Sequence, residues 1–164
     1  MKRILTVCLI ALSLVACNKT ASTGAPTQQS PAATLAAGNA FLEANAKKEG
    51  VKTTPSGLQY KIVSSGPADG LPPKATDEVK VNYRGTLTNG HEFDSSYQAG
   101  IPATFRVNEV VPGWTEALQL MRPGDVWMVY LPAKLGYGEE SKGPDLPSNS
   151  ALIFKVELLD VLHL

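Results

Sequence analysis

The chain has 164 residues, which is the length of one domain with additional terminal segments. Its 15 Lys and Arg residues balance 15 Asp and Glu residues, and no long basic run is present, so we expect no nucleic-acid partner. The two cysteines, Cys8 and Cys17, both lie near the N-terminus, which excludes a disulfide framework in the rest of the chain.

Residues 1–16 have the layout of a secretory signal peptide. Lys2 and Arg3 precede an apolar run from Ile4 to Val15. This run is too short to span a bilayer comfortably as a stable anchor, whereas it suits the apolar core of a signal. We therefore expect an exported protein.

The signal ends in LVAC, a string that resembles a bacterial lipobox. The resemblance implies cleavage before Cys17, a diacylglycerol group on its thiol and acylation of its freed amine. The alternative is an ordinary signal with an incidental cysteine, but the leucine, the small residue before Cys17 and the length of the apolar run favour lipidation. We expect a lipid anchor in a bacterial membrane. Asn18, by resemblance to enterobacterial lipoproteins, favours the outer membrane, facing the periplasm or the surface.

Residues 17–33 consist mainly of Ser, Thr, Ala, Gln, Pro and Gly, which cannot bury enough apolar surface to fold. We interpret them as a flexible tether. Residues 34–56 follow as a short helical segment, with a helix from Thr34 to Glu49 and Gly50 as its stop. This helix is expected to pack on the edge of the domain; the alternative is the remnant of a dimerisation helix.

Residues 57–164 show the periodicities of a folded domain. Apolar and polar residues alternate at 58–63 and 78–87, which predicts half-buried strands, and Asn89-Gly90 is a hairpin signal. A short strand is expected at 103–107. The segments 126–131 and 151–162 are predicted to be central strands.

One short helix is predicted after Pro112. Trp114, Ala117, Leu118 and Met121 have the i, i+3, i+4, i+7 spacing of one helix face, and Pro123-Gly124 ends the pattern. With the strands, this predicts an α+β fold in which an antiparallel sheet of about five strands surrounds one short helix. A loop at 132–149 separates the last two strands, and a loop of this length in a compact domain is usually functional.

The chemistry-bearing residues predict neither a metal nor a cofactor. His91 and His163 have no partner at metal-ligand spacing and are expected to be solvated, Ser95-Ser96 lacks a nucleophile-elbow context, and no Gly-rich phosphate loop precedes a helix. Asp94 is the acid that stands out. Its ordinary interpretation is a turn residue that bonds its own backbone, unless aromatic residues surround it.

Four motifs in order resemble the FKBP-type peptidyl-prolyl isomerases: VNYRGTLTNGHEFDSSY, VVPGWTEALQLMRPGD, LGYG and LPSNSALIFKVELL. They cover residues 57–164. The upstream string NAFLEANAKKEGVKTTPSGLQY is similar to the branch that includes the macrophage infectivity potentiators, which carry a long N-terminal dimerisation domain. Because the corresponding stretch is short here, we expect a monomer.

The resemblance implies a half-barrel sheet wrapped on the helix, with a proline pocket between them. It implies binding of proline-containing polypeptides and of the family's macrolide inhibitors. Asp94, Trp114 and Tyr137 would take part in catalysis, with Trp114 as the pocket floor. The substrate-binding residues would be Tyr83, Phe93, Phe105, Val110, Val111, Leu146 and Phe154. Two residues at the rim of this pocket depart from the family. Ala103 stands where some eukaryotic members carry Phe, and Leu135 replaces a tyrosine.

Two functions share this pocket. One is peptidyl-prolyl cis-trans isomerisation, which assists the folding of periplasmic or surface proteins. The alternative is a lipid-tethered chaperone or host-interaction module with little isomerase activity. Taken singly, Phe154 and Tyr83 have the character of core residues. The four motifs occur together and in the family's order, which favours the isomerase.

Overall fold

The computed structural model describes residues 30–163. The predicted signal at 1–16, the predicted lipidation site Cys17 and the predicted tether up to residue 29 therefore lie outside the described residues. None of the helices within the described range is both long enough and apolar enough to cross a bilayer.

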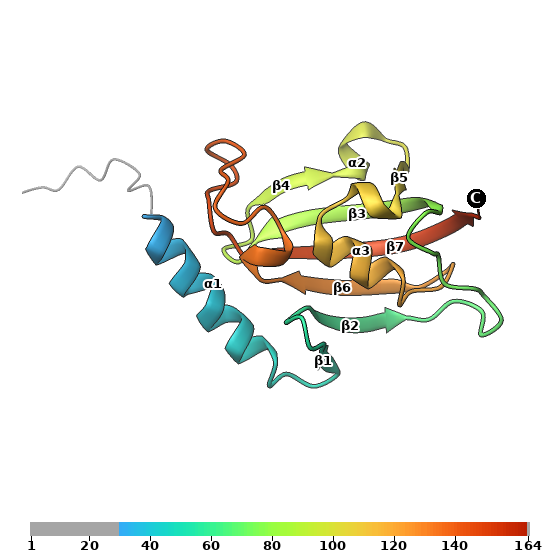
Figure 1. The fold of residues 1–164 in the computed structure, drawn as a ribbon, viewed down its shortest axis with the longest axis horizontal. Helices are drawn as coiled ribbons and strands as arrows, with labels where there is room; N and C mark the ends of the chain where they lie inside the picture. Colours follow the sequence, from blue (N-terminus) through green and yellow to red (C-terminus); the bar gives the residue numbers. More distant parts are fainter. Residues whose placement is uncertain (1–29, 164) are drawn as a thin grey trace, which may run out of the picture.

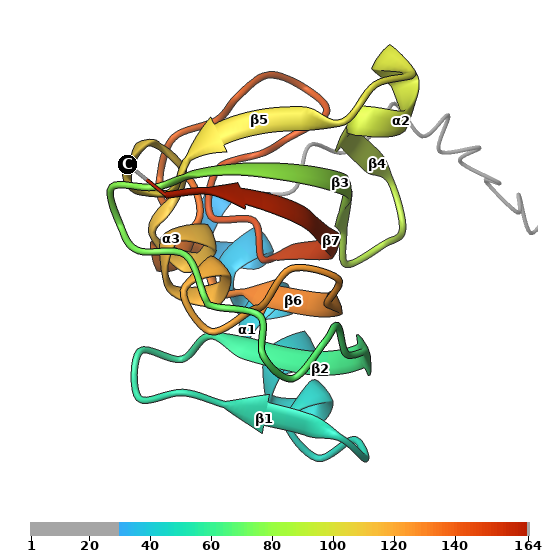
Figure 2. The same cartoon turned by 90° about the vertical axis from the view of Figure 1, so that its right-hand side faces the viewer.

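Seven strands form one antiparallel sheet in the order β1-β2-β6-β7-β3-β4, and β5 pairs with β3 beside β4. Figure 2 shows the strands stacked from β1 at one edge to β5 at the other. The strands are β1 (Val51–Thr53), β2 (Gln59–Ser64), β3 (Glu78–Leu87), β4 (Glu92–Ser95), β5 (Ala103–Arg106), β6 (Val126–Leu131) and β7 (Leu152–Leu162).

Three α-helices and two 3-10 turns complete the described part of the chain. They are α1 (Pro31–Asn45), α2 (Ser96–Ala99), α3 (Pro112–Leu118), η1 (Val107–Glu109) and η2 (Ala133–Leu135). Figure 1 shows α3 lying across one face of the sheet and α1 beside one end of it. The predicted α+β class with an antiparallel sheet is confirmed.

The long strands have the predicted positions because their side chains alternate between core and solvent. In β3, Val79, Val81 and Tyr83 are buried, while Lys80 and Arg84 are exposed. β7 lies between β6 and β3, and β6 lies between β2 and β7, as expected for central strands. The sheet has seven strands where about five were predicted, since β1 and β4 have three and four residues and are too short to show a period. The hairpin signal at Asn89-Gly90 does lie in the turn that joins β3 to β4.

Helix α1 begins and ends earlier than predicted. Ser30 is its N-cap, with Oγ accepting from the Ala33 amide at 3.3 Å, and Pro31 occupies the first turn. The helix ends at Asn45, and Gly50, with φ of +77°, lies in the turn that leads into β1. The segment 34–56 thus holds a helix and a strand.

Buried amides hold α1 against the sheet. Gln59 Nε2 donates to the Leu42 carbonyl at 2.9 Å, and Asn45 Nδ2 donates to Gln59 Oε1 at 3.0 Å. At Gly38 the helix approaches the residue that precedes β7 so closely that an added Cβ would lie 2.9 Å from the Cβ of Ala151. α1 is therefore an integral part of the domain edge, as the sequence predicted.

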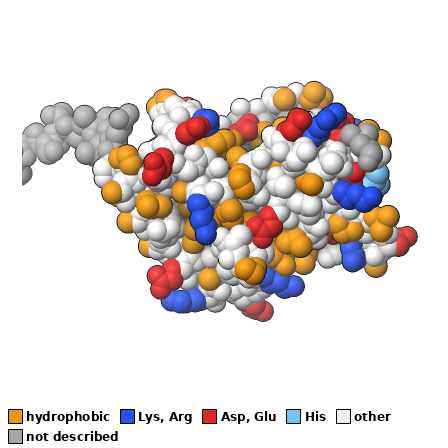
Figure 3. Space-filling model, viewed as in Figure 1, with side chains coloured by type: hydrophobic (Ala, Val, Ile, Leu, Met, Phe, Trp, Pro, Cys, Tyr) orange, Lys and Arg blue, Asp and Glu red, His pale blue; other side chains and the backbone are white. Residues whose placement is uncertain are grey.

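The surface mixes charges of both signs. On the face that Figure 3 shows, acidic and basic side chains are interspersed, with apolar side chains between them. Among the described residues on this face there is no broad basic area of the kind that binds nucleic acid.

Candidate functional site

Five aromatic side chains meet where α3 crosses the sheet. We call this set the aromatic cluster: Tyr83 of β3, Phe93 of β4, Phe105 of β5, Trp114 of α3 and Phe154 of β7. The Trp114 indole is 5% exposed and meets three rings edge-on, with centroid distances of 5.2 Å to Tyr83, 5.2 Å to Phe154 and 5.8 Å to Phe105. Edge-to-face contacts of this kind fix ring orientation as well as burying apolar area.

The strand register brings the rings together. Tyr83 pairs with Val156 and Gly85 pairs with Phe154, so Tyr83 and Phe154 come from adjacent strands. A Cβ at Gly85 would lie 2.7 Å from Phe93 and 2.8 Å from Phe154. Gly85 therefore makes room for the edge-on contact between these two rings, whose centroids are 5.6 Å apart. Sequence reasoning missed Gly85, although a glycine within a strand is a signal of close approach.

Asp94 is joined to the cluster by one hydrogen bond. The Tyr83 hydroxyl donates to Asp94 Oδ2 at 2.7 Å, across eleven positions of sequence. Asp94 itself is exposed, whereas Tyr83 is 8% exposed. Asp94 therefore bonds a distant side chain, which differs from the ordinary interpretation of a turn residue. Burial raises the pKa of Tyr83, and the hydrogen bond to Asp94 raises it further.

The N-terminus of α3 presents a backbone donor beside the rings. The Val111 carbonyl accepts from the amides of Trp114, at 2.9 Å, and Thr115, at 3.1 Å, so Val111 is the N-cap of α3, which begins at Pro112. No hydrogen bond within residues 30–163 uses the Val111 amide itself. Val110 and Val111 are half-buried and pack against the core that contains the aromatic cluster.

The loop between β6 and β7 has a defined shape. The Asn149 amide donates to the Gly138 carbonyl at 2.7 Å, and the Lys142 amide donates to the Leu146 carbonyl at 3.0 Å. Leu146 is buried in the same core as Trp114, and Tyr137 is half-buried against it. The structure therefore brings both predicted loop residues to the core that contains the aromatic cluster.

Charged residues on this loop were missed by sequence reasoning. The Lys142 ammonium lies 5.4 Å from the centroid of the Tyr137 ring. His91 Nε2 lies 3.2 Å from Asp145 Oδ1, which joins the β3–β4 turn to the loop. Loop residues that meet through folding leave no local pattern, so neither contact was predictable.

Both histidines are exposed, as predicted, but each also lies beside an acidic side chain. His91 pairs with Asp145. His163 Nδ1 lies 2.7 Å from Oδ2 of the buried Asp77. Both pairings join residues far apart in the chain. Within residues 30–163 no group of three or more His, Cys, Asp or Glu side chains is placed to hold a metal ion.

Nine of the ten predicted site residues belong to one core cluster or pack directly against it, and Asp94 is hydrogen-bonded to it. Ala103 and Leu135, the two rim departures, also pack against this core. The arrangement offers an apolar, aromatic surface with a few oriented polar groups at its edge, which is the usual composition of a site for a small apolar group.

Comparison with known proteins agrees with this arrangement. The sequence model described as "FKBP-type peptidyl-prolyl cis-trans isomerase" matches residues 70–159, more than half of the chain, and that described as "Domain amino terminal to FKBP-type peptidyl-prolyl isomerase" matches residues 13–62.

Among relatives, the chain is 56% identical over 124 residues to the FKBP-type peptidyl-prolyl cis-trans isomerase FkpA of Aeromonas hydrophila, which covers 76% of this chain and 45% of that protein. It is 52% identical over 126 residues to the Outer membrane protein MIP of Legionella longbeachae, covering 77% and 53%. The chain thus spans about half the length of these curated relatives.

A solved structure matches over nearly its whole length. The crystal structure of a peptidyl-prolyl cis-trans isomerase from Pseudomonas syringae pv. tomato has a TM-score of 0.74 and 35% identity, covering 82% of this chain and 98% of that one. The fold, the ordered motifs and these matches together place the chain in the FKBP-type peptidyl-prolyl cis-trans isomerase family.

Proposed function

We propose that this chain catalyses cis-trans isomerisation of X-Pro bonds in polypeptides, with residues 57–164 as the isomerase domain. The observation that carries the proposal is the aromatic cluster around Trp114, bordered by the unused Val111 amide and by the Tyr83–Asp94 hydrogen bond. The relatives named as peptidyl-prolyl isomerases support the same activity.

The chemistry needs no covalent intermediate. Twisting an amide breaks its resonance against a barrier of ~18–20 kcal/mol, and the uncatalysed X-Pro step takes roughly tens to hundreds of seconds. The twisted amide has lost conjugation, so its carbonyl is less polar than in the planar form. An apolar, water-poor site penalises the planar ground state more than the twisted state, and binding that favours the twisted state lowers the barrier.

Each residue has a role in this proposal. The Trp114, Phe105 and Phe154 rings bury the proline ring. The Val111 amide and the Tyr137 hydroxyl donate to carbonyl groups of the bound peptide. Phe93, Val110 and Leu146 complete the apolar walls.

Asp94 acts through Tyr83. Its carboxylate accepts from the Tyr83 hydroxyl at 2.7 Å and holds that ring against Trp114. Because the raised pKa of Tyr83 keeps its hydroxyl protonated, this hydrogen bond persists at neutral and mildly alkaline pH. Asp94 thereby tunes the field of the site without transferring a proton.

We further propose an exported, monomeric protein anchored by lipid at Cys17. The lipobox-like LVAC motif supports the anchor, and the name of the Legionella relative, Outer membrane protein MIP, supports an outer-membrane location. The substrates are then proline-containing polypeptides of the cell envelope. Macrolide inhibitors of the family would occupy the aromatic cluster.

The test is an isomerisation assay on the mature chain with a short X-Pro peptide, read by NMR exchange so that no coupled protease is needed. We expect exchange between the cis and trans peptide signals to speed up in proportion to protein concentration, and a macrolide to abolish the effect. Suppression of aggregation of an unfolded protein with no acceleration of exchange would instead support the chaperone alternative.

A further inference from the structure

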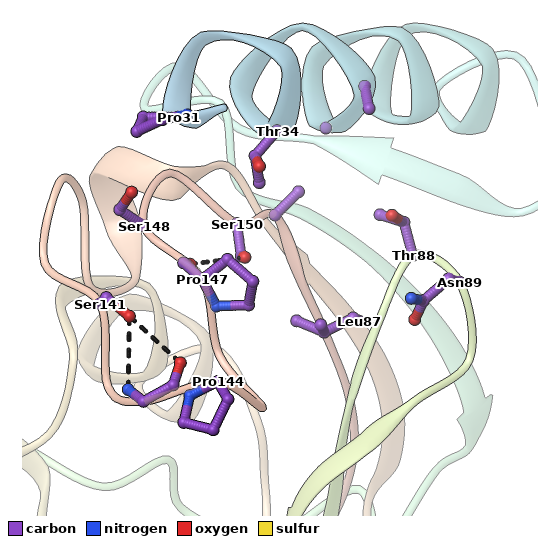
Figure 4. A pocket seen from close by; sticks show the side chains of 14 residues that line it. Pro31, Thr34, Leu87, Thr88, Asn89, Ser141, Pro144, Pro147, Ser148 and Ser150 are labelled. Carbon is purple, nitrogen blue, oxygen red and sulfur yellow. Dashed lines mark hydrogen bonds between the residues drawn. The ribbon is translucent and has the colours of Figure 1, made fainter. Parts of the chain in front are cut away.

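A hollow lies beside the β6–β7 loop. It has a volume of about 720 Å³, within the roughly 300–1,000 Å³ typical of ligand sites. We call it the α1 groove. Figure 4 shows its three walls, which are α1, the β3–β4 turn and the loop. Its lining residues are Pro31, Thr34, Ala37 and Gly38, then Leu87, Thr88 and Asn89, then Ser141, Gly143, Pro144, Pro147, Ser148, Ser150 and Ala151.

The lining carries no charged side chain. It alternates proline, alanine and leucine surfaces with hydroxyl and amide groups. Several of these polar groups are used internally: Ser150 Oγ donates to the Pro147 carbonyl at 2.7 Å, and Ser141 Oγ donates to the Gly143 carbonyl at 3.1 Å.

Two other hydroxyls line the groove, those of Thr88 and Ser148. Neither makes a hydrogen bond to another residue drawn in Figure 4. Uncharged donors and acceptors beside apolar surface match an extended polypeptide, whose backbone offers neutral N–H and C=O groups. Burial of a charged ligand here would lack a compensating partner.

The β6–β7 loop contributes residues both to the core that contains Trp114 and to the groove. Leu146 packs into this core, and the next residue, Pro147, lines the groove. Tyr137 packs against the same core, and Ser141 lines the groove four residues later. One loop therefore links the two sets of residues.

We propose that the α1 groove binds an extended, uncharged segment of the same polypeptide whose proline occupies the aromatic cluster. The inference rests on the proposed function and assigns it a second binding site. A substrate that crosses the loop contacts both sites, so the groove favours long, unfolded chains over short peptides.

Ala37 and Ala36 provide a matched pair for the test. Both are exposed on α1, but only Ala37 lines the groove. Arginine is a strong helix former, so Ala37→Arg and Ala36→Arg perturb the helix equally, and only Ala37→Arg fills the groove. Each variant is assayed with an X-Pro tetrapeptide and with a long uncharged peptide that contains the same X-Pro core.

We expect the wild-type chain to show a KM about tenfold lower for the long peptide, which corresponds to about 1.4 kcal/mol of additional binding. Ala37→Arg abolishes this advantage and leaves tetrapeptide turnover unchanged, while Ala36→Arg retains it. Equal kinetics of the two variants on the long peptide, or no wild-type advantage, overturns the proposal. If the wild-type chain did not isomerise the tetrapeptide, that result would instead contradict the proposed isomerase function.

A second measurement does not depend on turnover. Ala37→p-benzoylphenylalanine places a photo-crosslinker in the groove, and the long uncharged peptide is the probe. A crosslink to the peptide supports the inference. A crosslink to residues 18–29 of the same chain, to a second copy, or to nothing shows a different occupant or none, and overturns it.

Discussion

At the residue scale, the Tyr83–Asp94 hydrogen bond distinguishes two mechanisms. In one Asp94 is a general base, and in the other it transfers no proton. A carboxylate that acted as general base would cost ~10²–10⁴-fold in rate when removed. Because Asp94 accepts a hydrogen bond from the buried Tyr83 hydroxyl, we expect Asp94→Asn to lower kcat/KM by less than about tenfold. We also expect no sizeable solvent deuterium effect on kcat/KM. Near-complete loss together with a solvent isotope effect of about two or more would return Asp94 to an acid-base role.

The raised pKa of Tyr83 predicts how the stability of the fold changes at alkaline pH. Burial first, and then the Asp94 hydrogen bond, raise its pKa above the value of about 10 of a free tyrosine. The unfolded chain therefore loses this proton at lower pH than the folded chain. The contribution of Tyr83 to stability is full below about pH 10 and is lost as pH rises above that value.

We expect the free energy of unfolding, measured with denaturant between about pH 8 and 11, to fall as pH approaches and passes about 10, with a shallower fall for Tyr83→Phe. Burial also raises the pKa of Tyr130, so Tyr130→Phe serves as the comparison and removes a separate part of the slope. An unchanged slope in Tyr83→Phe would show that this phenol is not held in its protonated form.

Trp114 gives an optical test of the aromatic cluster. Its indole is edge-on to three rings. The second tryptophan, Trp127, instead stacks on Tyr60 on another part of the sheet, with ring centroids 4.4 Å apart. We expect a saturating macrolide inhibitor to quench or shift the Trp114 emission. Trp114→Phe isolates the Trp127 background, and no ligand-dependent difference after subtraction would contradict the binding mode.

At the scale of elements, Gln59 connects α1 to the sheet. Its side chain is 5% exposed and makes hydrogen bonds to Asn45 and to the Leu42 carbonyl. Gln59→Met preserves the approximate volume but leaves these buried groups unpaired, so we expect a loss of about 1–3 kcal/mol in the free energy of unfolding. Gln98→Met removes a hydrogen bond that is exposed to solvent and should change stability by less than about 0.5 kcal/mol.

The two variants are compared by urea denaturation under identical conditions. Equal stability losses would show that α1 is held mainly by other contacts, such as the close approach of Gly38 to Ala151. Because the helix forms one wall of the α1 groove, the outcome also measures how firmly that wall is held.

At the scale of the whole molecule, the proposed lipid anchor determines where the domain works. Cys17→Ala removes the thiol that the lipobox-like motif presents. Since stable anchoring takes more than one acyl chain, we expect the variant to remain unprocessed or to appear in the soluble fraction, whereas the wild-type chain partitions with membranes. Fractionation with a metabolic lipid label measures this. Membrane-bound Cys17→Ala cleaved at the same site would exclude the lipobox interpretation.

The sequence alone determined the fold class, the long strands and the family. The segments 78–87 and 126–131 are strands at the predicted residues, because alternation over many positions records which side chains face the core. Trp114 follows Pro112-Gly113 at a helix start, as its spacing predicted. The ordered motifs identified the aromatic residues that meet at this helix.

The tertiary structure decided the rest. β1 and β4 exist because β2 and β3 offer them hydrogen-bonding edges, and three or four residues carry no period of their own. The contacts of Asp94 with Tyr83, of His91 with Asp145 and of Gln59 with α1 join side chains that are distant in sequence. Such contacts depend on the register of the sheet and the path of the loop, and folding alone sets both.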